Sequence, residues 1–191
     1  MRLRGRTVVL GRAERLVALL AASSLGACAG KGSGACATKV TPEVCETPAN
    51  LRGVEPVQET RVVAPAPQLV PEPLIDGRYV QTARTRYCEQ DYQPLLEQGG
   101  NVQAVTEISG CVLRSTIVAA GEQPLVFVLT FRYAADGTLD VTPACSGDKT
   151  PVLGRQYGFD GTTLQFPSSS DESDSDGLIH TCERIDSFEL R

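Results

Sequence analysis

Seven cysteines are the residues of this 191-residue sequence best suited to covalent chemistry. No two of them form a Cys-x-x-Cys pair, so a zinc ribbon and a thioredoxin-like redox site lack their usual spacing. Six of the seven follow Cys28, and an even number in an exported chain predicts three disulfide bonds. These six are Cys36, Cys45, Cys88, Cys111, Cys145 and Cys182.

The order of the expected strands favours one pairing of these six cysteines. Cys88 ends the first expected strand and Cys111 opens the next long one, and antiparallel neighbours would bring those ends together. Cysteines that are close in sequence need the least chain ordering to pair. We therefore predict the bonds Cys88–Cys111, Cys145–Cys182 and Cys36–Cys45. The alternative ties the N-terminal tail to the domain, for example through Cys45 and Cys88.

Signals for catalysis are weak. His180 is the only histidine, and the sequence has no Gly-x-Ser-x-Gly elbow, no His-Glu-x-x-His and no phosphate-binding loop. We interpret His180 as a strand residue beside a disulfide. The sequence thus predicts a protein that is not an enzyme, with no catalytic residues and no cofactor.

Residues 172–183 resemble the calcium loop of EF-hand proteins. In that loop a series of oxygen ligands surrounds one hard cation. Glu172 replaces the first aspartate of the pattern, however, and Pro167 with the serines after it opposes an entering helix. We interpret the segment as a solvated acidic tip between two strands and predict no metal site. The matching positions are Asp174, Asp176, Gly177, Ile179 and Glu183.

The first 27 residues have the three parts of a secretory signal. Five arginines and one glutamate precede the apolar run 16–22, and small residues then lead to Cys28. This run is shorter than the ~20 residues that span a bilayer. Leu25-Gly26-Ala27-Cys28 also resembles the lipobox of bacterial lipoproteins. The resemblance implies cleavage before Cys28 and lipid attachment to that cysteine; the alternative is an ordinary signal peptide with Cys28 in a disulfide.

Lipid on Cys28 would place the protein in the cell envelope, held to a membrane by its N-terminus. Ala29 and Gly30 follow the cysteine, without the aspartate that retains lipoproteins at the inner membrane of enteric bacteria, which favours the outer membrane. Removal of residues 1–27 leaves a net charge of −9. This acidity argues against nucleic acid and anionic membrane surfaces as partners.

Composition divides the remaining chain into two parts. Residues 28–73 contain seven of the twelve prolines and show no apolar periodicity, which predicts an extended, flexible tether. The alternative is a tail packed along the domain. Residues 74–191 then form the expected folded domain, which we expect to fold without the tether.

Short strands with alternating apolar residues dominate that domain. The clearest is 125–133, with Leu, Phe, Leu, Phe and Tyr on one face. Asp136-Gly137 and Asp160-Gly161 predict tight hairpin turns. Other expected strands are 77–87, 111–119, 138–142, 156–159, 162–166 and 178–185, with one short helix at 90–98.

Six or seven antiparallel strands in about 115 residues predict an all-β fold, a small barrel or sandwich. Gly77-Arg78-Tyr79 is similar to the Gly-x-Trp opening of lipocalin-like domains of bacterial lipoproteins, with Tyr for Trp. Residues 159–164 are similar to a late hairpin in such domains. The resemblance implies a barrel that binds a small apolar ligand inside or a protein at its rim. A purely structural envelope protein and an enzyme with an unrecognised site are the alternatives.

Overall fold

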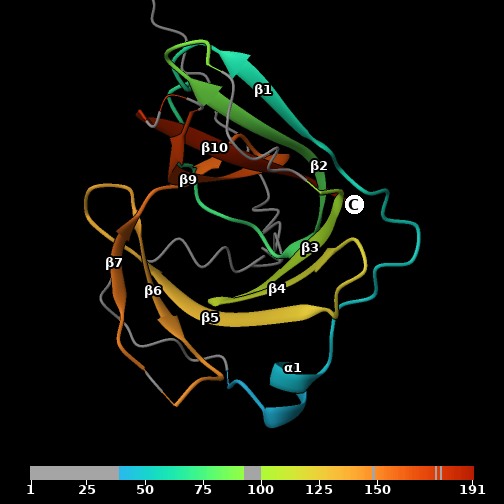
Figure 1. The fold of residues 1–191 in the computed structure, drawn as a ribbon. Helices are drawn as coiled ribbons and strands as arrows, with labels where there is room; N and C mark the ends of the chain where they lie inside the picture. The colour runs from blue at the N-terminus through green and yellow to red at the C-terminus, as the bar shows by residue number, and fades with distance from the viewer. Residues whose placement is uncertain (1–38, 93–99, 148, 175, 177) are drawn as a thin grey trace, which may run out of the picture.

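The computed structural model describes residues 39–92, 100–147, 149–174, 176 and 178–191. These residues form one short helix, α1 (Pro42–Glu46), and an extensive β-sheet (Figure 1). The strands are β1 (Glu59–Val63), β2 (Gly77–Cys88), β3 (Val102–Ser109), β4 (Val112–Ala119), β5 (Leu125–Tyr133), β6 (Leu139–Pro143), β7 (Val152–Arg155), β8 (Gly158–Phe159), β9 (Thr163–Ser173) and β10 (Ile179–Leu190).

The strands follow an up-and-down path that almost closes on itself. From β2 to β10, each strand pairs antiparallel with the next, except that β7 and β8 do not pair, and β10 returns to pair with β2. The sheet therefore curls into an incomplete barrel that is open between β7 and β8 (Figure 1). This confirms the all-β, antiparallel barrel-like fold that the alternating sequence predicts.

Both predicted hairpin turns are present. Gly137 and Gly161 have φ values of 84° and 94°, a region that favours glycine. The carboxylates of Asp136 and Asp160 accept hydrogen bonds from the backbone N–H of Thr138 and Thr162. The side-chain and then the backbone hydrogen bond from Thr138 lower the pKa of Asp136, and the backbone hydrogen bonds from Thr163 and then Thr162 lower the pKa of Asp160. Glycine at the positive-φ position and local hydrogen bonds to the aspartate thus favour both turns.

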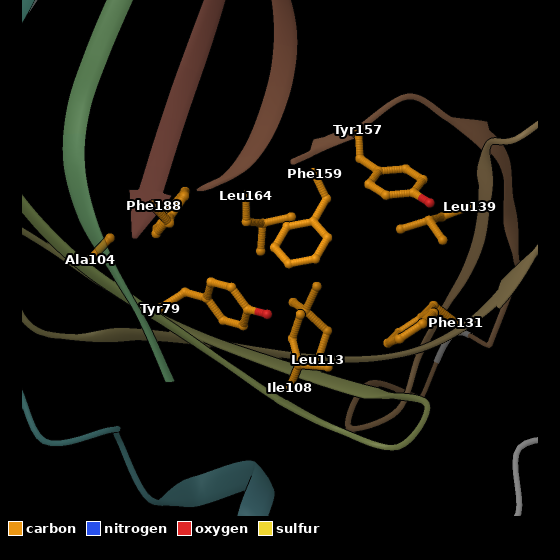
Figure 2. Packing of buried hydrophobic residues seen from close by; sticks show 10 residues of the cluster. All are labelled: Tyr79, Ala104, Ile108, Leu113, Phe131, Leu139, Tyr157, Phe159, Leu164 and Phe188. Carbon is orange, nitrogen blue, oxygen red and sulfur yellow. The ribbon is translucent and has the colours of Figure 1, made fainter. Parts of the chain in front are cut away.

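Aromatic and aliphatic side chains fill the middle of the curled sheet (Figure 2). Tyr79 is fully buried, and its ring meets that of Phe159 edge-on at 6.1 Å between centroids. Burial raises the pKa of the Tyr79 phenol to about 12. On β5, Phe131 belongs to this core, whereas Phe127 nearer the start of the strand is 48% exposed. The interior is therefore well packed around Tyr79, whereas the side chains near the start of β5 are partly exposed to solvent.

The prediction of a flexible tether is wrong for residues 39–73. β1 pairs in parallel with β2, and Val70 accepts a hydrogen bond from the N–H of Phe159 in β8. Ala49 and Val54 are buried against Val80 and Val105 on the other face of the sheet. That face carries apolar side chains that need cover, which composition alone does not reveal. Residues 28–38 lie outside the described part.

The predicted disulfide pairing is also wrong. Cys45 in α1 pairs with Cys145 after β6, and Cys88 pairs with Cys182. Cys111 is disulfide-bonded as well. The prediction failed because it assumed that the tail was free and that β2 lay beside the strand after Cys111. Instead β3 (Val102–Ser109), which sequence analysis missed, separates β2 from β4.

Residues 93–99 of the predicted helix at 90–98 lie outside the described part, and residues 90–92 are not helical. In the described residues, no helix is both long enough and apolar enough to cross a membrane.

Candidate functional site

Charged residues replace apolar ones on the inner face of the sheet as it continues along β2, β10 and β9. On β9, Leu164 and Phe166 face the core, so the alternation of a strand places Ser168, Ser170 and Glu172 on the same face. Directly paired residues share a face. Strand pairing adds the basic and acidic residues Arg84, Arg86, Arg184 and Asp186 from β2 and β10.

Arg86 is the centre of this polar region. It forms ion pairs with Glu59 of β1, at 2.7 Å, and with Glu172 of β9. The side chains of Arg86, Glu59 and Glu172 are only 4, 8 and 5% exposed. A buried guanidinium needs such partners because an unpaired buried charge costs several kcal/mol (roughly 3–5 on removal of one partner). The network therefore fixes β1, β2 and β9 relative to one another.

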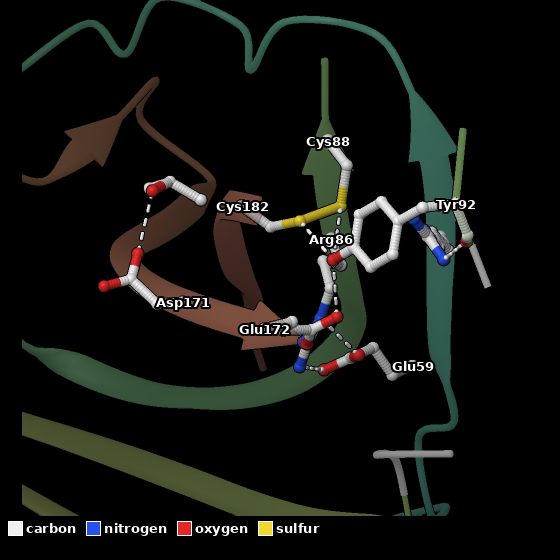
Figure 3. Close-up of a disulfide and its surroundings, with 9 residues drawn as sticks. Glu59, Arg86, Cys88, Tyr92, Asp171, Glu172 and Cys182 are labelled. Atoms are coloured by element: carbon white, nitrogen blue, oxygen red, sulfur yellow. Dashed lines mark hydrogen bonds and ion pairs between the residues drawn. A yellow bond between two sulfur atoms is a disulfide. The ribbon is translucent and has the colours of Figure 1, made fainter. Parts of the chain in front are cut away.

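Tyr92 links this network to the Cys88–Cys182 disulfide (Figure 3). Its hydroxyl donates a hydrogen bond to Glu172 Oε2 at 2.7 Å and lies 3.0 Å from Cys182 Sγ. The Arg61 guanidinium lies 3.9 Å from the ring centroid, a cation–π distance. The segment after β2 is thus held by aromatic, ionic and hydrogen-bonded contacts to three strands.

His180 stacks on Tyr92, with the ring centroids 3.9 Å apart and the planes at 8°. Its Nε2 lies 2.7 Å from Asp174 Oδ2. The other carboxylate oxygen of Asp174 accepts hydrogen bonds from the backbone N–H of Asp176 and Leu178. The histidine, followed by the backbone of Leu178, lowers the pKa of Asp174. Asp174 therefore stabilises the β9–β10 turn and orients the imidazole.

A cleft of about 850 Å³ lies beside these residues. This volume is within the range of sites for small ligands, ~300–1,000 Å³. Its wall includes Tyr92 and His180 together with the buried disulfide. Most of the other lining residues are polar or charged; they include Tyr87, Glu89, Arg155, Ser168, Thr181 and Glu183. The arrangement offers many hydrogen-bonding groups and more polar than apolar surface.

The acidic segment 172–183 does not have the geometry of an EF-hand. Glu172 lies at the end of β9 and is ion-paired with Arg86, whereas Glu183 lies within β10. Asp174 is used by the turn and by His180. Gly177 lies outside the described residues. Across the described part of the chain, no group of three or more His, Cys, Asp or Glu residues is placed to hold a metal ion.

Sequence analysis missed the buried ionic network. Arg84 and Arg86 alternate in a strand expected to have a buried face, and this was the available signal. Their acceptors lie far away in sequence, at Glu59, Glu172 and Asp186. The prediction that His180 lies in a strand near a disulfide is confirmed, because β10 also carries Cys182.

Comparisons with known protein families, with curated proteins and with solved structures gave no match for this chain.

Proposed function

We propose that this protein is a lipid-anchored component of the bacterial envelope that acts by binding a ligand in the cleft beside Tyr92 and His180. Cys28 would carry the lipid, and the curled sheet would present the cleft. The single observation that supports a binding role is this cleft of about 850 Å³, whose walls are built on paired strands. Its polar lining favours a polar ligand over the apolar one that a lipocalin-like barrel implies.

Rigid supports around the cleft favour a binding site over an incidental hollow. The Cys88–Cys182 bond joins two strands at its wall, and the Arg86 network lies directly behind Tyr92. Such support preorganises polar groups, so that less ordering is needed when a ligand binds.

Anchoring is tested with Cys28→Ser in the full-length chain. We expect the native protein to enter the detergent phase and the variant to stay in the aqueous phase. Mass spectrometry should find acyl chains on Cys28 as the N-terminal residue. An unmodified N-terminus at or near residue 28 would refute the lipid anchor.

Binding is tested by fluorescence, because the chain contains no tryptophan. Ser169→Trp introduces a single reporter at the exposed edge of the cleft, and Ser109→Trp at the exposed end of β3 is the matched control. We expect polar probes, a disaccharide or a short peptide, to shift the emission only of Ser169→Trp. A shift with palmitate alone would instead support an apolar ligand.

A hydrolytic enzyme is a second candidate, and the Asp174–His180 pair is the observation that favours it. A carboxylate that orients an imidazole is the usual arrangement for a general base. Turnover of ester or amide probes that disappears in His180→Gln, with ligand binding retained, would support this function. Equal rates for both proteins would exclude it.

A further inference from the structure

β9 has a long free edge. It pairs with β10 from Thr163 to Ser173, but its other edge pairs with β8 only at Leu164 and Gln165. In the part of the chain that the structure describes, no strand pairs with that edge from Phe166 onward. Pro167 lies on this stretch, and proline is tolerated in a strand where its missing N–H faces an open edge. With respect to the described residues, the backbone groups along this edge are available to another strand.

The cleft reaches the first part of this free edge and also extends over residues of β10 and β2. Pro167, Ser168 and Ser169 line one side of it. Residues 154–156, at and just after the end of β7, also line it. The barrel is open between β7 and β8, and because β8 pairs with only two residues of β9, the rest of this β9 edge is unpaired among the described strands. The cleft therefore borders the open side of the barrel, where one more strand could pair with β9.

We propose that an extended segment of a partner protein binds in the cleft by adding as a strand to the free edge of β9. This proposal rests on the proposed binding function and names the class of ligand. Main-chain hydrogen bonds would supply affinity, as in other cases of β-strand addition.

The charge of the cleft defines the partner segment further. Glu89 and Glu183 line it and Asp171 is exposed on β9, whereas Arg155 is the one cation among its lining residues. The balance is negative, so the segment that fits best carries lysine or arginine. Proline would be excluded from the positions that donate hydrogen bonds to β9.

The same chain already uses strand addition elsewhere in its fold. Val57 and Val102 exchange two backbone hydrogen bonds of 2.8 and 3.0 Å, and Val70 accepts one from Phe159 at the edge of β8. β7 is the poorer edge for such an addition. Gly154 has a positive φ of 66° and interrupts its regular pairing, a feature that protects edges.

The test uses a synthetic eight-residue peptide of alternating lysine, valine and threonine with the full, oxidised protein. Backbone amide exchange along residues 168–172 is measured by NMR with and without peptide. We expect exchange at the amides that face the cleft to slow by about tenfold or more. A peptide of the same sequence with alternate backbone nitrogens methylated should give no protection, because it lacks the donors.

Charge is tested with Glu183→Lys, for which Glu122→Lys on the exposed β4–β5 turn is the matched control. Only Glu183→Lys should weaken peptide binding, by about tenfold. Binding of a peptide or disaccharide, reported by Ser169→Trp without protection of β9, overturns strand addition but leaves the binding function intact. No fluorescence response to any probe overturns both.

Discussion

Cys88 and Cys182 lie directly opposite each other on β2 and β10, with their Cα atoms 4.6 Å apart and their sulfur atoms bonded. β2 and β10 are the first and last strands of the antiparallel path but neighbours in the sheet, so this bond joins two strands that are far apart in the sequence. The same bond supports Tyr92, whose hydroxyl contacts Cys182 Sγ. The junction of β2 with β10 and one wall of the cleft therefore share this pair of residues.

Replacing both cysteines, Cys88→Ala with Cys182→Ala, should lower the free energy of unfolding by about 4 kcal/mol, because the bond closes a loop of 94 residues. Denaturant unfolding followed by circular dichroism measures this loss. Peptide mapping of the unreduced protein provides the control. A bond from Cys88 to Cys111 in that map would contradict the structure.

Removing Arg86 should destabilise the fold more than removing an exposed arginine. Arg86→Met leaves two buried carboxylates without their cation, so we expect a loss of roughly 3–5 kcal/mol. Arg132, paired with Asp140 on the surface, is the control, and Arg132→Met should cost less than about 1 kcal/mol. Adding Glu59→Gln and Glu172→Gln to Arg86→Met should restore part of the stability. Equal losses in the two single variants would argue against the buried network.

Acid should weaken the β9–β10 turn through Asp174. Its pKa is lowered in the folded protein by His180 and by backbone N–H groups. The carboxylate therefore contributes stability above the ordinary aspartate pKa of ~3.9, and this contribution is lost as pH falls through the lower folded value. At pH 7 wild type should melt at a higher temperature than Asp174→Asn, and this difference should shrink as the pH falls below ~4. Asp176→Asn, at an exposed site, should follow wild type throughout.

Millimolar calcium should change the melting temperature little. Glu172 is engaged by Arg86, and Asp174 by the turn and His180, so the oxygens of the EF-hand-like pattern do not surround one point. Calorimetry with and without calcium measures the effect. A large rise that Asp176→Asn abolishes would refute this interpretation.

Deleting residues 39–72 should prevent stable folding of the remainder, contrary to the expectation from sequence. The deletion removes the Cys45–Cys145 bond, β1 and the buried Ala49 and Val54 together. We expect no cooperative thermal transition under oxidising conditions. The double variant Cys45→Ala with Cys145→Ala keeps the packing and should still unfold cooperatively, at a lower temperature. A well-folded deletion variant would show that the N-terminal segment is dispensable.

Local sequence determined the strands and turns with clear patterns. The alternation along residues 125–133 and the Asp-Gly pairs at 136–137 and 160–161 act over a few residues, so they predict β5 and two hairpins directly. Together with the other short segments expected to be strands, these patterns were sufficient to predict the barrel-like fold class.

Tertiary structure alone decided the cysteine pairing, the packing of residues 39–73 and the polar cleft. Cys45 meets Cys145 across 100 residues, and Arg86 meets Glu172 only because β10 returns to β2. A proline-rich segment looks unstructured by composition, yet it packs where an apolar face such as that of Val80 and Val105 needs cover. Contacts between distant residues depend on strand order, and strand order is set by the burial of whole faces, which no short segment specifies.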